Sequence, residues 1–99
     1  MIEHIVLFRW TPEATSERIA AGMEALRGLR HSIAGITALA CGADFSGRAQ
    51  GYTHVLVIRF SDRASFDAYG PSSAHRAVVE THLKPILQDV IDFDFEVTP

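Results

Sequence analysis

The stretch from residue 52 to residue 60 is apolar on both of its alternating faces, and this constrains the fold more than any other feature. One face carries Tyr52, His54, Leu56, Ile58 and Phe60, and the other carries Thr53, Val55, Val57 and Arg59. The β-branched and aromatic residues favour a β-strand, whose successive side chains point to opposite sides of a sheet. We therefore expect helices against one side of the sheet and a second structure against the other.

Three further segments have the composition of strands, over residues 4–10, 36–43 and 90–97. A helix over about residues 15–30, capped by Thr15 or Ser16, separates the first two strands. A second helical region begins after Ser61 or Asp62 and is interrupted at residues 70–71, where glycine and proline break helices. It resumes over about residues 74–88, and Pro85 predicts a kink or a break near Lys84.

The resulting order of elements is β-α-β-β-α-β over residues 1–99, which predicts one domain of the α+β class with a ferredoxin-like antiparallel sheet. A chain of 99 residues, 47% of them apolar, has a core of modest size. Small domains of this kind often bury a further apolar face against a second copy. We therefore expect a homodimer.

The last predicted strand alternates sharply between apolar and acidic residues. Its apolar set is Ile91, Phe93, Phe95 and Val97, and its acidic set is Asp92, Asp94 and Glu96. We expect the apolar set to face the interior of the protomer and the carboxylates to form a solvated face or the rim of a subunit contact.

The formal charge of -3 and the scattered basic residues leave no positive stripe, so we expect neither nucleic acid nor an anionic membrane as a partner. The apolar run near the N-terminus is too short to span a bilayer and follows no basic leader. Cys41 is the single cysteine, which is typical of a reducing compartment and indicates a cytoplasmic protein. Its apolar surroundings favour a small buried hydrophobe over a nucleophile.

Histidine and tyrosine residues are the main candidates for chemistry. His4 and His54 share the parity of apolar residues on two strands that this topology places side by side, and His75 begins the last helical stretch. If the three imidazoles and Tyr69 border one cavity, the chain has an acid/base site, with His75 as a base and Tyr69 as a hydrogen-bond donor. The alternative is that these residues are hydrogen-bonded structural groups.

Aromatic residues beside these histidines are candidate pocket walls or core. Phe8 and Trp10 lie on the same strand face as His4. No metal site is predicted, because His75 and His82 are seven positions apart, about 10 Å along a helix, and cannot chelate one ion. A mixed site from His4, His54 and His75 remains an alternative, but no carboxylate or thiolate is placed to complete it.

Several short motifs together resemble the stress-responsive A/B barrel domain family, and the resemblance covers essentially the whole chain. The motifs are His4-Ile-Val-Leu-Phe, Gly51-Tyr-Thr-His54, Phe66-Asp-Ala-Tyr69, Ala74-His75 and Phe93-Asp-Phe95. The most specific are Gly-Tyr-Thr-His and the spacing from Tyr69 to His75. The chain differs from the family at Ser72-Ser73, where members often have His-Pro, and this difference bears on the pocket mouth and the substrate.

This resemblance implies a dimeric α/β barrel in which the sheets of two protomers pack face to face. The family includes plant stress-inducible proteins and a polyketide cyclase. By this resemblance His75 is the general base and Tyr69 its assistant in a cofactor-free cyclase or isomerase, with His4 and His54 binding substrate in the same pocket. Two alternatives remain: a non-catalytic ligand-binding or stress-protection protein, and a cofactor-free monooxygenase.

Overall fold

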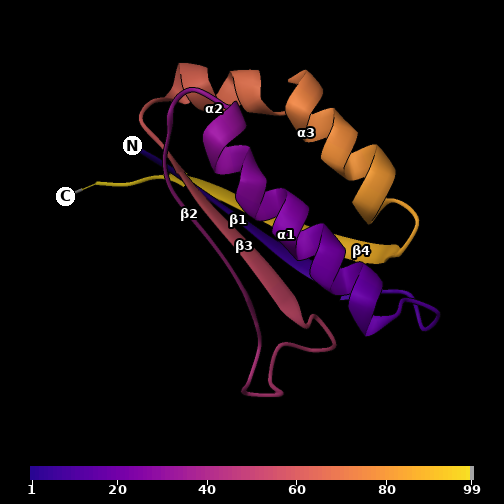
Figure 1. Cartoon of the computed structure of the whole chain (residues 1–99). Coiled ribbons are helices and arrows are strands. Elements are labelled where there is room, and N and C mark those ends of the chain that lie inside the picture. Colours follow the sequence, from indigo (N-terminus) through magenta and orange to yellow (C-terminus); the bar gives the residue numbers. More distant parts are fainter. Residues whose placement is uncertain (99) are drawn as a thin grey trace.

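The computed structural model describes residues 1–98 as a four-stranded sheet with helices against one of its sides (Figure 1). The elements are β1 (Ile2–Trp10), α1 (Ser16–Ser32), β2 (Ile36–Ala43), β3 (His54–Phe60), α2 (Arg63–Tyr69), α3 (Ser73–Val78), the π-helical turn η1 (Val79–Leu83) and β4 (Leu87–Glu96). The strand order is β2-β3-β1-β4, and all neighbouring strands are antiparallel. The predicted ferredoxin-like fold is confirmed.

The core lies between the helices and the even-numbered positions of β1 and β3. Its most deeply buried side chains are Phe60, Leu26, Leu56, Ile58 and Ile86. Met23, Leu26 and Leu29 of α1 form its buried stripe, at the spacing of one face of a helix, while Ile19 is only partly buried. The parity of the two central strands is therefore as predicted, with β3 covered by helices on one of its sides.

Side chains cap all three α-helices at their N-termini. Thr15 accepts a hydrogen bond from the backbone of Arg18, and Asp62 accepts one from the backbone of Ser65. Ser72 caps α3 by accepting from the backbone amide of His75. Each of these caps is at a position that the sequence marks as a helix start, since a hydroxyl or carboxylate oxygen satisfies an otherwise free amide of the first turn.

The last helical segment ends earlier than predicted, at Leu83 instead of Gln88. The amide of Lys84 donates to the carbonyl of Val79, five residues earlier, over 2.9 Å, as in a π-turn. At this wider turn Leu83 is buried, whereas His82 is only partly buried. The expected break before Pro85 is present, and Leu87 already belongs to β4.

The prediction that the apolar face of β4 points into the protomer is wrong. Ile91, Phe93 and Phe95 are 45%, 63% and 43% exposed, on the side of the sheet that carries no helix. Asp92 and Asp94 face the helices instead, where Asp94 lies opposite His4 in the register of β1 and β4. Alternation separates two faces of a strand, but it does not say which face meets the helices of the same chain.

Together these residues complete an apolar surface on the uncovered side of the sheet, which we call the open face. It comprises Ile5 and Leu7 of β1, Val55 and Val57 of β3, and Ile91, Phe93 and Phe95 of β4. A salt bridge of 2.6 Å between Arg59 and Glu3 borders it. A contiguous exposed apolar surface of this kind is typical of a protein–protein interaction site.

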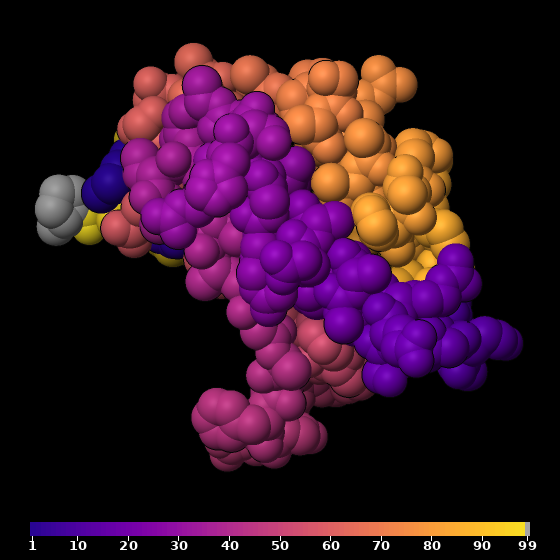
Figure 2. Space-filling view, viewed as in Figure 1, coloured from indigo at the N-terminus to yellow at the C-terminus, as the bar shows by residue number. Residues whose placement is uncertain are grey.

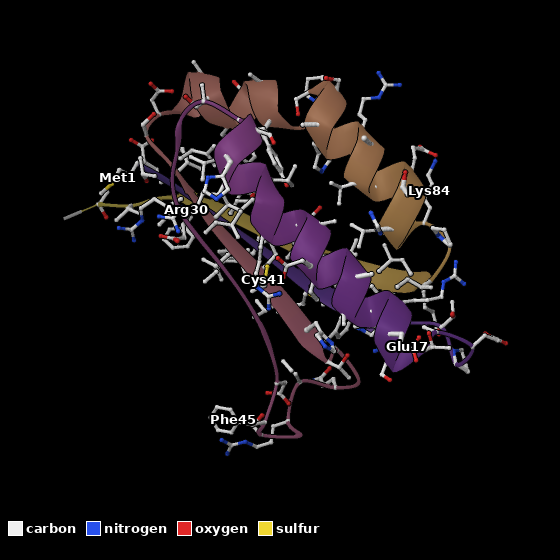
Figure 3. The ribbon with its side chains drawn as sticks, in the orientation of Figure 1. Met1, Glu17, Arg30, Cys41, Phe45 and Lys84 are labelled. Atoms are coloured by element: carbon white, nitrogen blue, oxygen red, sulfur yellow. The ribbon has the colours of Figure 1, made fainter. Side chains whose placement is uncertain are left out.

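The connection from β2 to β3 projects from the body of the molecule (Figure 2). Its tip carries Phe45, which is fully exposed and points away from the rest of the chain (Figure 3). The predicted strand began at Tyr52, but β3 begins at His54 because the amide of Tyr52 closes a turn onto the carbonyl of Ala49. Within residues 1–98, no helix has the length and apolar character that a bilayer crossing requires.

Candidate functional site

A cavity of about 470 Å³ lies between the helix side of the sheet and the segment α2-α3-η1. Its walls are largely apolar, with a small number of polar groups from both the sheet and the helices, as is common in sites for small molecules. The residues around it are His4, Val6, Phe8, Leu26, Leu56, Phe66, Asp67, Tyr69, Gly70, His75, Val79, Leu83, Leu87, Val90, Asp92 and Asp94. Four of the six candidates named from the sequence border this cavity: His4, Phe8, Tyr69 and His75.

The turn between α2 and α3 holds Tyr69 and His75 against each other, with ring centroids 4.4 Å apart. The Ser72 hydroxyl donates to the carbonyl of Tyr69 over 2.7 Å and accepts from the amide of His75 over 3.3 Å. One serine therefore ties the end of α2 to the start of α3. The Ser72-Ser73 pair, where this chain differs from the family pattern, supplies this cap.

The hydrogen bonding of His75 defines its tautomer. Its Nδ1 lies 2.9 Å from the carbonyl oxygen of Gly70, and a carbonyl can only accept a hydrogen bond. The proton of the neutral imidazole is therefore on Nδ1, and the lone pair is on Nε2. A histidine in this state can take up a proton at Nε2.

Tyr69 is buried, and both burial and the charge of Asp92 raise the pKa of its phenol well above the usual value. The phenol therefore keeps its proton at neutral pH and acts as a hydrogen-bond donor. Its ring also makes an edge contact with His4 at a centroid distance of 5.7 Å. Tyr69 thus lies between the two imidazoles of the cavity.

His4 is only 8% exposed, and its Nδ1 is hydrogen-bonded to the carboxylate of Asp94. Since a carboxylate accepts, Nδ1 carries the proton and Nε2 is left with a lone pair when the imidazole is neutral. No other residue among 1–98 hydrogen-bonds to this imidazole. The Asp94 contact was missed at the sequence level, because the carboxylates of β4 were expected to face solvent.

His54 and Trp10 lie outside this cavity. Trp10 stacks on Phe8 with the ring planes 3° apart, and its Nε1 donates to Nδ1 of His54 over 2.9 Å. His54 borders a smaller cavity of about 250 Å³ beside the β2–β3 connection. Three histidines at one pocket were expected, and the structure places two there.

The separation of His4 and His54 follows from the strand register. His54 pairs with Phe8, whereas His4 pairs with Ile58. The two imidazoles share a sheet face but are four residues apart along the strands, about 13 Å at 3.3 Å per residue. Parity predicts the side of the sheet on which a residue lies, and register is needed to predict its neighbours.

Other candidates for chemistry do not join the site. Burial raises the pKa of the Cys41 thiol, which lies on β2 and does not border the cavity. This favours a packing role, since the thiolate is the reactive form. Across residues 1–98, no group of three histidine, cysteine or acidic side chains could hold a metal ion.

A family model described as the stress responsive A/B barrel domain matches residues 2–97. The chain belongs to this family. A dimeric ferredoxin-like protein of unknown function from Thermobifida fusca resembles this A/B barrel domain at 30% identity, with 97% of this chain and 90% of that one covered and a TM-score of 0.85.

Two plant structures share the fold of this A/B barrel domain at lower identity. An Arabidopsis thaliana protein is 24% identical, with 100% and 97% of the two chains covered and a TM-score of 0.88. A hydroxynitrile lyase from Passiflora edulis is 19% identical, with 99% and 96% covered and a TM-score of 0.85. A search of curated proteins gives no match.

Proposed function

We propose that this A/B barrel domain binds a small hydrophobic, carbonyl-bearing molecule and transfers a proton within it, as a cofactor-free cyclase or isomerase of the polyketide cyclase type. The observation that carries this proposal is the free Nε2 of His75 beside the phenol of Tyr69 in one cavity. The ring centroids of the base, His75, and the neutral donor, Tyr69, are 4.4 Å apart. This arrangement suits the removal of a proton from a carbon next to a carbonyl group.

In this mechanism Nε2 of His75 takes a proton from the carbon next to the carbonyl, and the Tyr69 hydroxyl donates a hydrogen bond to the carbonyl oxygen as it becomes an enolate. In an isomerase, the imidazolium returns the proton to another carbon. In a cyclase, the enolate carbon attacks a second carbonyl of the same molecule, whose oxygen then receives the proton. Every electron pair comes from the substrate or the imidazole, so the reaction requires no cofactor.

The carbonyl of Gly70 has a defined part in this scheme. By accepting from Nδ1 of His75 it holds the ring in one tautomer and stabilises the imidazolium once Nε2 is protonated. His4, with Asp94 behind it, would contact the substrate from the sheet. Phe8 would supply part of the apolar wall.

The same proposal includes a cytoplasmic homodimer formed by the open face. Relatives such as the Thermobifida fusca protein are described as dimeric, and the open face leaves three large side chains of β4 uncovered in the protomer. Face-to-face packing of two sheets would cover both sides of β3, as its sequence requires.

Two alternatives have different support. A non-catalytic ligand-binding or stress-protection protein would use the same cavity without turnover, and a cofactor-free monooxygenase would use it to admit oxygen. The Passiflora edulis lyase shows that a protein of this fold can be an enzyme. At 19% identity to this chain, it does not indicate which reaction this chain would catalyse.

The test is turnover on a panel of polyketide-like ketones, lactones and hydroxynitriles. We expect His75→Ala to lower kcat/KM by about a hundredfold or more and Tyr69→Phe by about tenfold or more. His82→Ala is the matched control, because His82 lies in η1 and does not border the cavity. Full activity of the His75 variant would exclude this mechanism, and inactivity of the unaltered protein across the panel would favour the binding protein.

A further inference from the structure

The charged groups around the cavity are all of one sign, apart from the titratable imidazoles. Three carboxylates border it, those of Asp67, Asp92 and Asp94. None of its lining residues is a lysine or an arginine. The remainder of the wall is mostly apolar, so these carboxylates are its fixed charges, and all three aspartates are also accessible to water.

The three carboxylates differ in how far other groups neutralise them. Asp67 forms a salt bridge with Arg63 on α2, with Nε and Oδ1 3.1 Å apart. Asp94 is hydrogen-bonded to His4. Asp92 is exposed and forms no ion pair with any residue of the described chain, so no basic side chain neutralises its charge at the cavity.

Asp92 also acts on the proposed reaction centre. Asp92 and Tyr69 both line the cavity, and after burial the charge of Asp92 is the next cause that raises the pKa of the phenol. The same negative charge would oppose an enolate forming on an oxygen bonded to Tyr69. A positive charge on the ligand, placed beside Asp92, would remove this opposition.

We infer that the natural ligand of this cavity combines an apolar, carbonyl-bearing body with a protonated amine, and that the cavity discriminates against carboxylates. Asp92 and Asp94 would receive the ammonium group, while Tyr69 and His75 would act on the carbonyl. An anionic ligand would meet the like charge of these aspartates with no lysine or arginine in the wall to offset it, and this repulsion gives the pocket its selectivity. The inference deepens the proposed function by naming its substrate class.

Three probes of matched shape test this selectivity by binding alone. They are benzylacetone, the primary amine made from it by reductive amination, and hydrocinnamate, used at pH about 7.5, where the amine is protonated and the carboxylate ionised. Titrations followed by NMR, with the amides of Tyr69, Gly70 and His75 as reporters, give both the affinity and the location. We expect the amine to bind tightest and hydrocinnamate at least about tenfold more weakly than the amine.

The variant Asp92→Asn should reduce the preference for the amine to about threefold or less, while benzylacetone binds as before. Glu96→Gln is the matched control, since Glu96 has the same strand parity on β4 but does not border the cavity. Hydrocinnamate binding as tightly as the amine, a preference unchanged by Asp92→Asn, or no binding of the amine at millimolar concentration would each overturn the inference. Because these outcomes do not depend on turnover, they are distinct from a failure of the proposed reaction.

Discussion

The Nδ1 atoms of His75 and His54 have opposite hydrogen-bonding roles. His75 donates from Nδ1 to a backbone carbonyl and keeps a lone pair on Nε2, whereas His54 accepts at Nδ1 from the indole of Trp10. The first arrangement leaves a base at the cavity. The second is satisfied only by the neutral form of His54, because a protonated imidazole has no acceptor.

The environment of His54 predicts a pH dependence of stability. Burial lowers its pKa below the unfolded value of 6.5, so the unfolded chain binds more protons in the window below that value. Its contribution to stability is therefore complete above pH 6.5 and declines as the pH falls below it. Urea unfolding between pH 5 and pH 7.5 should show a smaller loss of stability at low pH for His54→Gln than for the unaltered protein.

His31→Gln is the control for this experiment, because His31 is an exposed residue at the end of α1. That change should leave the pH dependence as it is. An unaltered slope in the His54 variant would show that His54 does not contribute to it.

Two phenylalanines mark the extremes of burial in this chain. Phe60 is completely buried between β3 and the helices, and Phe45 is completely exposed. Phe60→Ala should lower the free energy of unfolding by about 3–5 kcal/mol, since it removes apolar contacts and leaves a cavity. Phe45→Ala should change it by less than about 0.5 kcal/mol, so equal effects of the two changes in urea denaturation would contradict this assignment of the core.

At the scale of elements, two glycines in and after α1 have opposite roles. Gly28 lies inside the helix, and a Cβ there would meet nothing within 4 Å. Gly35 connects α1 to β2 with φ of +90°, and a Cβ there would lie 2.3 Å from Oγ of Ser65. Gly28 is therefore replaceable, whereas Gly35 is required by its backbone conformation and by its close contact with α2.

We predict that Gly28→Ala raises the free energy of unfolding by about 0.5–1 kcal/mol, because alanine loses less conformational entropy in a helix. Gly35→Ala should lower it by about 1–3 kcal/mol, through strain at positive φ and the contact with Ser65. Denaturant midpoints measured side by side test both signs. Stabilisation by Gly35→Ala would mean that the turn has another conformation.

The elements also show what a sequence pattern can and cannot predict. Capping residues such as Thr15 and Asp62 act within one helical turn, so their positions were predictable. The π-turn of η1 was not, and it accompanies a contact between distant segments: Leu83 lies against α1 near Gly22, where a Cβ would be 3.5 Å from Cδ2 of Leu83. Contacts between distant segments select such local distortions, and a local pattern does not contain them.

For the whole molecule, the open face is the feature with the largest consequence. A stable interface buries about 800 Å² per partner, and the apolar residues of three neighbouring strands provide a continuous surface for it. The proposed dimer would enclose the open face between two sheets and leave each helix-side cavity with its own protomer.

Phe93→Asp tests this dimer, because Phe93 is the most exposed large side chain of β4 and lies opposite Ile5 on the open face. A carboxylate there should weaken self-association by about a hundredfold or more, since a buried charge without a partner is costly. Phe45→Asp is the matched control on the β2–β3 connection and should leave the dimer intact. Analytical ultracentrifugation that finds the unaltered protein monomeric at micromolar concentration would refute the dimer.

The sequence by itself determined the order of elements, the helix starts, the two faces of each strand and the family, because these depend on residues close together in the chain or on alternation. It also named His4, His54, Tyr69 and His75 as candidates for one cavity, with Phe8 and Trp10 as candidate walls, but it did not determine which of them share it. Only the tertiary structure decided that His4 is hydrogen-bonded to Asp94 and that His54 lies four strand positions from His4, outside the cavity. It also decided that the apolar face of β4 points away from the helices. Alternation has a period of two and is symmetric, so it separates two faces without choosing between them, and an apolar face can be covered by a second molecule as well as by the same chain.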